Sequence, residues 1–211
     1  MIEAGLVAAR FLHFAAATTL FGLALFPLYT RPSRISVQPV RVSRWLRTSI
    51  GCATVLGLLS ALAWAWFAIA GMTGTMMAAA DADRLFTVLR ETSFGQVWVV
   101  RLVLGVVLLT LILIRSNEHH SDRTIVLLAG LLLVTLALVG HTQTKDGALW
   151  IVHMSADGAH LLAAGAWLGG LLALGYVLML ARRLASAEHN AQALAALIHI
   201  SGMGMPPLPF L

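Results

Sequence analysis

Long apolar segments separated by short polar connections make up most of the chain. Five of them are long enough, or nearly long enough, to cross a membrane, and they predict helices at residues 2–27, 48–71, 95–115, 124–140 and 150–181. A sixth apolar segment, residues 191–205, starts like another helix and stops at a group of prolines. We therefore expect an all-α, polytopic membrane helix bundle of five transmembrane helices plus a partial sixth. Residues 1–211 form one integral-membrane domain in this prediction, with a truncated C-terminal end.

The composition agrees with a membrane protein. Hydrophobic residues make up 59% of the 211 residues and charged residues 11%, and this charged share is about half that of a typical soluble domain. The formal net charge is +5, but the basic residues lie between apolar segments and form no continuous stripe with interleaved aromatic residues. We therefore expect membrane lipid, and no nucleic acid, as a partner. The single cysteine, Cys52, excludes an internal disulfide or a site with several thiolates in one chain.

The arginines predict an orientation. The connection between the first two predicted helices contains five arginines and no acidic residue: Arg31, Arg34, Arg41, Arg44 and Arg47. Because basic residues are enriched in cytoplasmic connections, this segment is expected inside the cell and the N-terminus on the outer side. The connection that follows residue 71 is then an outer loop with mixed charges.

The predicted helix at residues 150–181 carries unusual polar residues for a membrane span. His153, Asp157 and His160 fall within a roughly 60° arc of one helix face. Glycines, which allow a neighbouring helix to approach closely, gather on another face: Gly158, Gly165 and Gly169. We expect this helix to lie inside the bundle, with its imidazoles and carboxylate paired, hydrated or bound to a metal, because an unsatisfied polar group in hydrocarbon costs several kcal/mol.

With the N-terminus outside, the ionisable residues within predicted spans all fall on the outer side of the membrane midplane. They are Arg10, His13, Arg101, His141, His153, Asp157 and His160. Methionines lie nearby, three in the outer loop and one beside His153: Met72, Met76, Met77 and Met154. Imidazole and thioether groups together suit copper, and thiols would oxidise in an outer compartment. The pattern therefore favours a copper site without cysteine.

In this hypothesis His153 and His160, with His13, form an intramembrane metal site, and Asp157 orients an imidazole or neutralises the charge of the ion. The methionines or His141 form a site where the ion enters. Arg10 and Arg101 are expected to balance the charge of Asp157 or to bind an anionic headgroup. Each feature has a structural alternative. The histidines could only pack helices, the arginines could extend to the outer interface, and the methionine loop could be an amphipathic turn.

The sequence HMSADGAHLLAAGAWLGGLLAL resembles the signature of the copper resistance D (CopD) family of inner-membrane proteins, and ARFLHFAAATTLFGLALF is similar to the first helix of that family. The resemblance covers residues 5–185, although family members are longer. It implies a multi-pass protein of the bacterial inner membrane, so the outer side, where the arginines place the N-terminus, is the periplasm. It also implies copper transport, a role in copper homeostasis or resistance, and a periplasmic copper-binding CopC-like partner. The implied site residues are His153, Asp157 and His160, with His13 in the first helix.

Two other functions remain open at this point. One is a membrane b-type haem protein with axial histidines from two helices, such as His13 and His160. The other is a non-catalytic assembly subunit whose histidines only pack helices, and the bundle could also form a homo-oligomer. We expect no enzymatic activity, because the sequence contains no nucleophile elbow, phosphate loop or H-E-x-x-H zinc motif.

Overall fold

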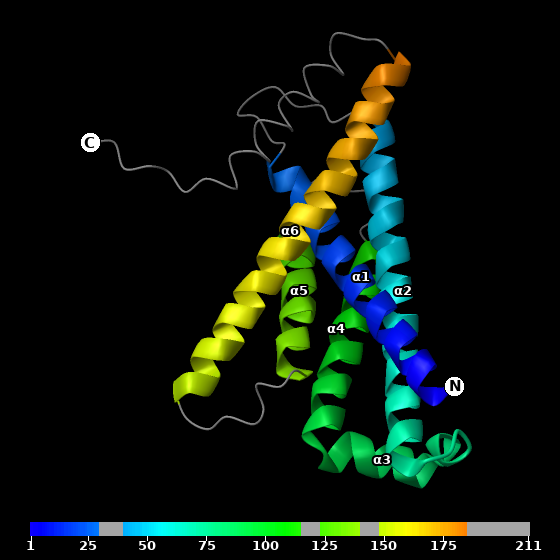
Figure 1. Cartoon of the computed structure of the whole chain (residues 1–211). Helices are drawn as coiled ribbons and strands as arrows, with labels where there is room; N and C mark the ends of the chain where they lie inside the picture. Colours follow the sequence, from blue (N-terminus) through cyan, green and yellow to red (C-terminus); the bar gives the residue numbers. More distant parts are fainter. Residues whose placement is uncertain (30–39, 115–122, 140–147, 185–211) are drawn as a thin grey trace.

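The computed structural model describes residues 1–29, 40–114, 123–139 and 148–184, and these residues form an all-helical bundle (Figure 1). Four of its helices are long and apolar enough to cross a membrane: α1 (Ile2–Tyr29), α2 (Val40–Thr73), α4 (Ser93–Ile114) and α6 (Ala148–Leu184). The shorter elements are the 3₁₀ helix η1 (Ala78–Ala80), α3 (Ala82–Glu91), α5 (Arg123–Val134) and the 3₁₀ helix η2 (Thr135–Val139). The prediction of an all-α polytopic membrane bundle is confirmed, and residues 191–205 lie outside the described residues.

Two helix ends differ from the prediction. α1 continues through Pro27 to Tyr29. A proline removes one backbone hydrogen bond and crowds the carbonyl four residues before it, but membrane helices tolerate proline where their surroundings satisfy the freed backbone groups. α2 begins at Val40, eight residues before the predicted start at residue 48. Its first turns are held by Val42 and Leu46, which are buried against the C-terminal parts of α1 and α6. Part of the arginine-rich connection is therefore helical.

α1 lies in the middle of the bundle and packs against α2, α5 and α6. Its contact with α6 is a contact between backbones. A Cβ atom added at Gly22 of α1 would lie 2.6 Å from the Cα of Gly169 and would also collide with the carbonyl oxygen of Gly165. The predicted glycine face of α6 is therefore confirmed as the face that another helix approaches closely.

One end of the bundle has a purely apolar core. Leu23 and Phe26 of α1 pack there with the last turns of α6 and with the start of α2. Trp45 of α2 stacks on Tyr176 of α6, with ring centroids 4.2 Å apart and planes 5° from parallel. These contacts bury large apolar side chains and hold the start of α2, which bears the arginines, against the end of α6.

The predicted helix at residues 124–140 is α-helical only as far as Val134 and ends in η2. A 3₁₀ helix rises about 2.0 Å per residue and an α-helix about 1.5 Å, so α5 and η2 together extend about 28 Å. This is close to the roughly 30 Å thickness of the hydrocarbon core of a bilayer. The change of helical geometry therefore lets a short apolar segment reach nearly across the membrane.

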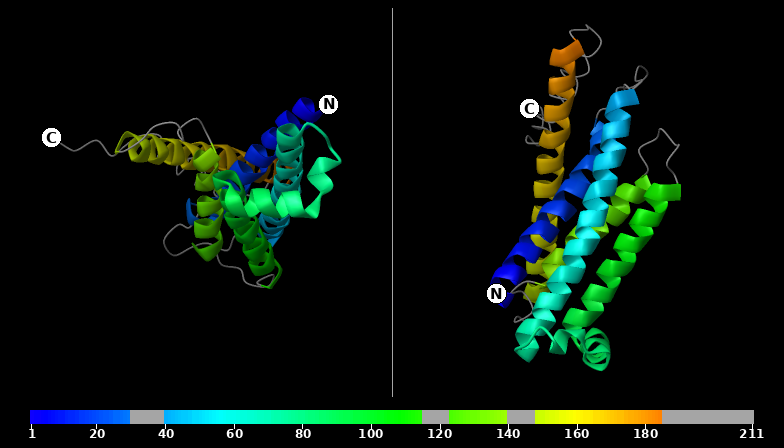
Figure 2. Two further views of the ribbon diagram at one scale, coloured as in Figure 1. Left: turned by 90° about the horizontal axis from the view of Figure 1, so that it is seen from below. Right: turned by 90° about the vertical axis from the view of Figure 1, so that its right-hand side faces the viewer.

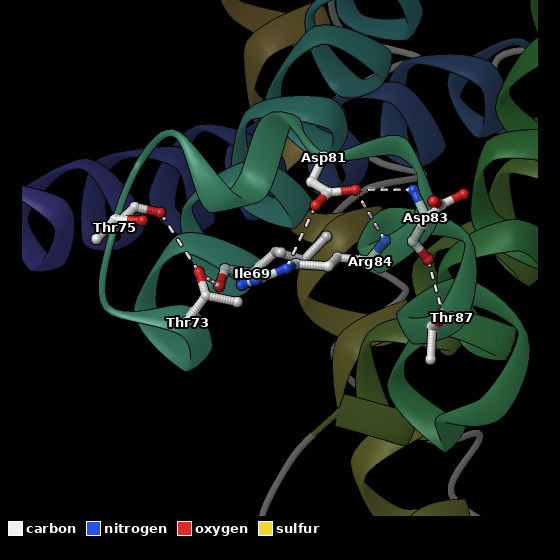
Figure 3. A network of polar contacts seen from close by, with 7 residues as sticks. All are labelled: Ile69, Thr73, Thr75, Asp81, Asp83, Arg84 and Thr87. Carbon is white, nitrogen blue, oxygen red and sulfur yellow. Dashed lines mark hydrogen bonds and ion pairs between the residues drawn. The ribbon is translucent and has the colours of Figure 1, made fainter.

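The connection after α2 is not an irregular loop. It contains α3, which lies across the ends of α2 and α4 instead of along the bundle (Figures 1 and 2). Asp81 caps α3 by accepting hydrogen bonds from the backbone N–H groups of Asp83 (3.0 Å) and Arg84 (3.5 Å), and Thr73 closes the end of α2 through the carbonyl of Ile69 (Figure 3). Periodicity over ten residues is too short a signal to outweigh the mixed charges of this segment, so the sequence did not predict the helix.

A buried polar cluster and an exposed histidine face

His13 is buried in α1, with 1% of its surface exposed. Its Nδ1 atom lies 3.0 Å from the carbonyl oxygen of Gly57 and 3.2 Å from Oγ of Ser60, both on α2. A carbonyl oxygen only accepts hydrogen bonds, so Nδ1 carries the proton and Nε2 holds a lone pair in the neutral ring. Nε2 has no hydrogen-bond partner among the described residues.

Arg101 of α4 is also buried, and it holds the start of η2. Its Nε donates to Oγ1 of Thr135 at 3.0 Å and its Nη2 donates to the carbonyl oxygen of Thr135 at 2.8 Å. Thr135 Oγ1 in turn donates to the carbonyl of Leu132 at 2.6 Å. The guanidinium therefore binds polar groups at the point where α5 changes to 3₁₀ geometry, and its Nη1 is left without a partner among the described residues.

Two tryptophans surround this charge. The Cζ atom of Arg101 lies 4.3 Å from the ring centroid of Trp98 and 5.5 Å from that of Trp64. The two indoles meet edge to face at 4.7 Å, and His13 meets Trp64 at 5.7 Å. Trp98 Nε1 donates to the carbonyl of Ala61 at 3.0 Å. The negative faces of the indoles stabilise the guanidinium, which has no ion pair with an acidic side chain in the part of the chain that the structure describes.

We call this group the buried polar cluster and define it as His13, Ser60, Trp64, Trp98, Arg101 and Thr135. Of this set, the sequence predicted only His13 and Arg101 as site residues. Trp98 precedes Arg101 by three residues and therefore lies on the same helix face, which is a signal that the sequence offered. Partners on other helices, such as Ser60 and Thr135, cannot be found from periodicity within one helix.

His153, Asp157 and His160 are exposed on α6. The helix is continuous through all three, so the carboxylate lies one turn from each imidazole, at a spacing where side chains on a helix interact. We call these residues the α6 histidine face. The prediction that this helix lies inside the bundle is wrong for the described residues. Its glycine face packs on α1, and its histidine face is left uncovered there.

The predicted metal residues therefore separate into two places. His13 faces α2 and α4, whereas His153 and His160 lie on the outer side of α6. Among the described residues, no group of three or more His, Cys, Asp or Glu side chains is placed to hold a metal ion. This arrangement also gives no support to a haem between His13 and His160, because the two imidazoles do not face each other.

The remaining predicted residues lie around the same end of the bundle. Met72 is exposed in the last turn of α2, Met76 and Met77 are exposed between α2 and η1, and Met154 is half-buried on α6. Figure 1 shows this connection and the start of α6 at one end of the molecule. His141 lies outside the described residues.

Neither arginine balances the charge of Asp157 within the described residues. Arg101 binds Thr135, and the exposed Arg10 lies over the ring of Trp64 with its Cζ 5.3 Å from the ring centroid. Arg10 therefore contacts the outside of the buried polar cluster, one turn of α1 before His13.

Comparison with known proteins places the chain in a family. The model of the copper resistance protein D-like N-terminal domain matches residues 1–151. The chain belongs to the copper resistance protein D-like family. It is 29% identical over 199 residues to the inner membrane protein YebZ of Escherichia coli strain K12, which covers 94% of this chain and 65% of that protein. It is 28% identical over 213 residues to the copper resistance protein D of Pseudomonas syringae pv. tomato, covering 93% and 67%.

The chain thus spans about two thirds of the length of these relatives. No solved structure matches it. The copper resistance protein D-like N-terminal match includes every member of the buried polar cluster and stops at residue 151, two residues before His153. The cluster therefore belongs to the domain that defines the family, whereas the α6 histidine face lies just beyond it.

Proposed function

We propose that this protein moves copper ions across the bacterial inner membrane and contributes to copper homeostasis or resistance. The observation that carries the proposal is membership in the copper resistance protein D-like family. The names of two relatives support the membrane location and the link to copper, since one is called an inner membrane protein and the other a copper resistance protein. Four helices of spanning length provide the membrane domain that such transport requires.

A periplasmic N-terminus fits the distribution of charges. Basic residues without acidic neighbours occupy the start of α2 and the end of α6: Arg41, Arg44, Arg47 and Arg182. The opposite end carries acidic and basic residues together, as in Asp81, Asp83, Arg84, Arg90 and Glu91. Because cytoplasmic connections are enriched in Lys and Arg, the first end is assigned to the cytoplasm.

The depth of the imidazoles supports a site in the outer half of the membrane. α1 and α6 cross where Gly22 meets Gly169, and both run toward the same end of the bundle (Figure 1). His13 precedes Gly22 by nine residues and His160 precedes Gly169 by nine, so both lie about 13 Å along their helices from the crossing. Both positions are on the periplasmic side of that crossing in the proposed orientation.

We assign copper to the α6 histidine face and not to His13. His153 and His160 offer two imidazoles, and Asp157 supplies a negative charge between them, which favours a bound cation. His13 instead shares its surroundings with the positive charge of Arg101, which repels a metal ion. The exposed methionines at the end of α2 and directly after it are assigned to the site where copper enters from the periplasm. A CopC-like protein is the proposed donor or acceptor there.

The α6 histidine face supplies only three groups and is uncovered among the described residues, so further ligands come from another surface. That surface belongs either to another segment of the protein or to a second copy in a homo-oligomer. Polar side chains facing hydrocarbon without partners are costly. Binding of an ion together with a second surface removes that cost.

The test is the copper content of the full chain purified in lipid nanodiscs. We expect the parent protein to retain copper and the double variant His153→Ala/His160→Ala to lose most of it. The matched control is Ser155→Ala, an exposed substitution on the same turns of α6 that removes no metal ligand. Equal copper in the parent and the double variant would disprove the site. A Soret band in the visible spectrum of the parent protein would favour the haem protein. Copper uptake into proteoliposomes that equals the uptake into protein-free liposomes would favour an assembly subunit.

A further inference from the structure

The buried polar cluster contains hydrogen-bonding groups that the described residues leave unpaired. Three buried side-chain atoms lack a hydrogen-bond partner in the part of the chain that the structure describes: Nε2 of His13, Nε1 of Trp64 and Nη1 of Arg101. They come from three different helices, α1, α2 and α4, and all three belong to the same cluster. Unpaired buried polar atoms are rare in folded proteins, so three of them in one cluster require an explanation.

The three residues are close to one another. The imidazole of His13 lies 5.7 Å from the ring of Trp64, and Cζ of Arg101 lies 5.5 Å from the same ring, measured to the centroid. Trp64 is therefore in contact with both of the other residues. The exposed fractions of the three side chains are 1–2%, so bulk water does not reach these atoms.

The hydrogen-bonding capacity of the three atoms defines the ligand. Nε1 of Trp64 and Nη1 of Arg101 can only donate a hydrogen bond. Nε2 of His13 can only accept one in the neutral ring, because Nδ1 uses its proton on the carbonyl of Gly57. The complementary ligand accepts two hydrogen bonds and donates one. A metal cation accepts none, and a halide cannot donate to the lone pair of the imidazole.

We propose that the buried polar cluster binds an internal water molecule that accepts hydrogen bonds from Arg101 and Trp64 and donates one to His13. Water is the smallest molecule with this capacity, and internal waters commonly make about three hydrogen bonds to otherwise unpaired groups. The site is independent of the proposed copper function. It keeps the guanidinium hydrated on one side, where the indole faces and Thr135 do not reach, and it engages the lone pair of His13.

The experiment is X-ray radiolytic footprinting of the full chain in nanodiscs, read by mass spectrometry. Hydroxyl radicals formed from a bound water oxidise adjacent side chains even where bulk water is excluded. After correction for intrinsic reactivity, we expect Trp64 and His13 to be oxidised at least several-fold faster than Phe21. Phe21 is a matched control because it is a buried aromatic residue of α1 within the apolar core. Equal protection of all three residues overturns the proposal.

The substitution Trp64→Phe sharpens the test, since it keeps an aromatic ring beside Arg101 and removes one donor to the water. We expect oxidation of His13 to fall several-fold in this variant and that of Phe21 to stay constant. If the variant does not fold, the comparison within the parent protein still decides.

Discussion

His13 and His160 lie at comparable depth on two helices that cross at a pair of glycines, but their surroundings are opposite. His13 is enclosed by α1, α2 and α4 and donates a hydrogen bond to Gly57. His160 is exposed on α6, one turn after Asp157. A histidine that is enclosed and partly paired contributes to the stability of the bundle. A histidine that is exposed within a membrane span needs a partner from elsewhere, which makes it the better candidate for binding.

The same contrast extends to charge. The buried polar cluster contains the guanidinium of Arg101 and, within the described residues, no acidic side chain, whereas the α6 histidine face contains a carboxylate and no basic side chain other than imidazole. The first environment disfavours a bound cation and the second favours one. The buried polar cluster and the α6 histidine face therefore suit different tasks, one architectural and one for binding.

The largest expected effect comes from separating α6 from the rest of the bundle. Gly169→Leu places a side chain where the backbone of Gly22 lies, and the two helices must move apart. We expect it to lower the free energy of unfolding by about 3 kcal/mol or more, measured by SDS titration. The control is Gly175→Leu, on the same helix, where an added Cβ atom meets nothing within 4 Å. If both variants unfold alike, the glycine contact does not position the α6 histidine face.

The next effect concerns the charge in the buried polar cluster. Arg101→Leu leaves the carbonyl and hydroxyl oxygens of Thr135 without their guanidinium donors, and we expect a loss of about 2 kcal/mol in the free energy of unfolding.

Arg10→Leu serves as its control, because Arg10 is exposed and contacts only the ring of Trp64 from outside in the described residues. That variant is expected to change the unfolding free energy by less than about 0.5 kcal/mol. An Arg101→Leu protein as stable as the parent would mean that α5 and η2 keep their geometry without the guanidinium.

Much of this arrangement could be predicted from the sequence, and the reason for each success or failure is physical. Apolar length predicted the spans, and the spacing of Gly165 and Gly169 predicted a close helix contact, because both signals lie within one segment. The partner of Arg101 could not be predicted, because Thr135 belongs to another helix and its position depends on packing. α2 begins early because Val42 and Leu46 are buried by tertiary contacts that outweigh the local excess of arginine.

The smallest expected effect separates the two histidines directly. His13→Ala removes the hydrogen bond to Gly57 and leaves a gap beside Trp64, so we expect a loss of about 1–2 kcal/mol in unfolding free energy and little change in bound copper. His160→Ala removes an exposed side chain and is expected to change stability by less than about 0.5 kcal/mol but to lower the copper content. Measuring the unfolding free energy and the copper content in both variants separates the two roles.

Reversed results, with copper lost in the His13 variant and stability lost in the His160 variant, would exchange the roles assigned to these residues. The metal site would then belong among α1, α2 and α4, where the guanidinium of Arg101 would have to be neutralised before a cation could bind.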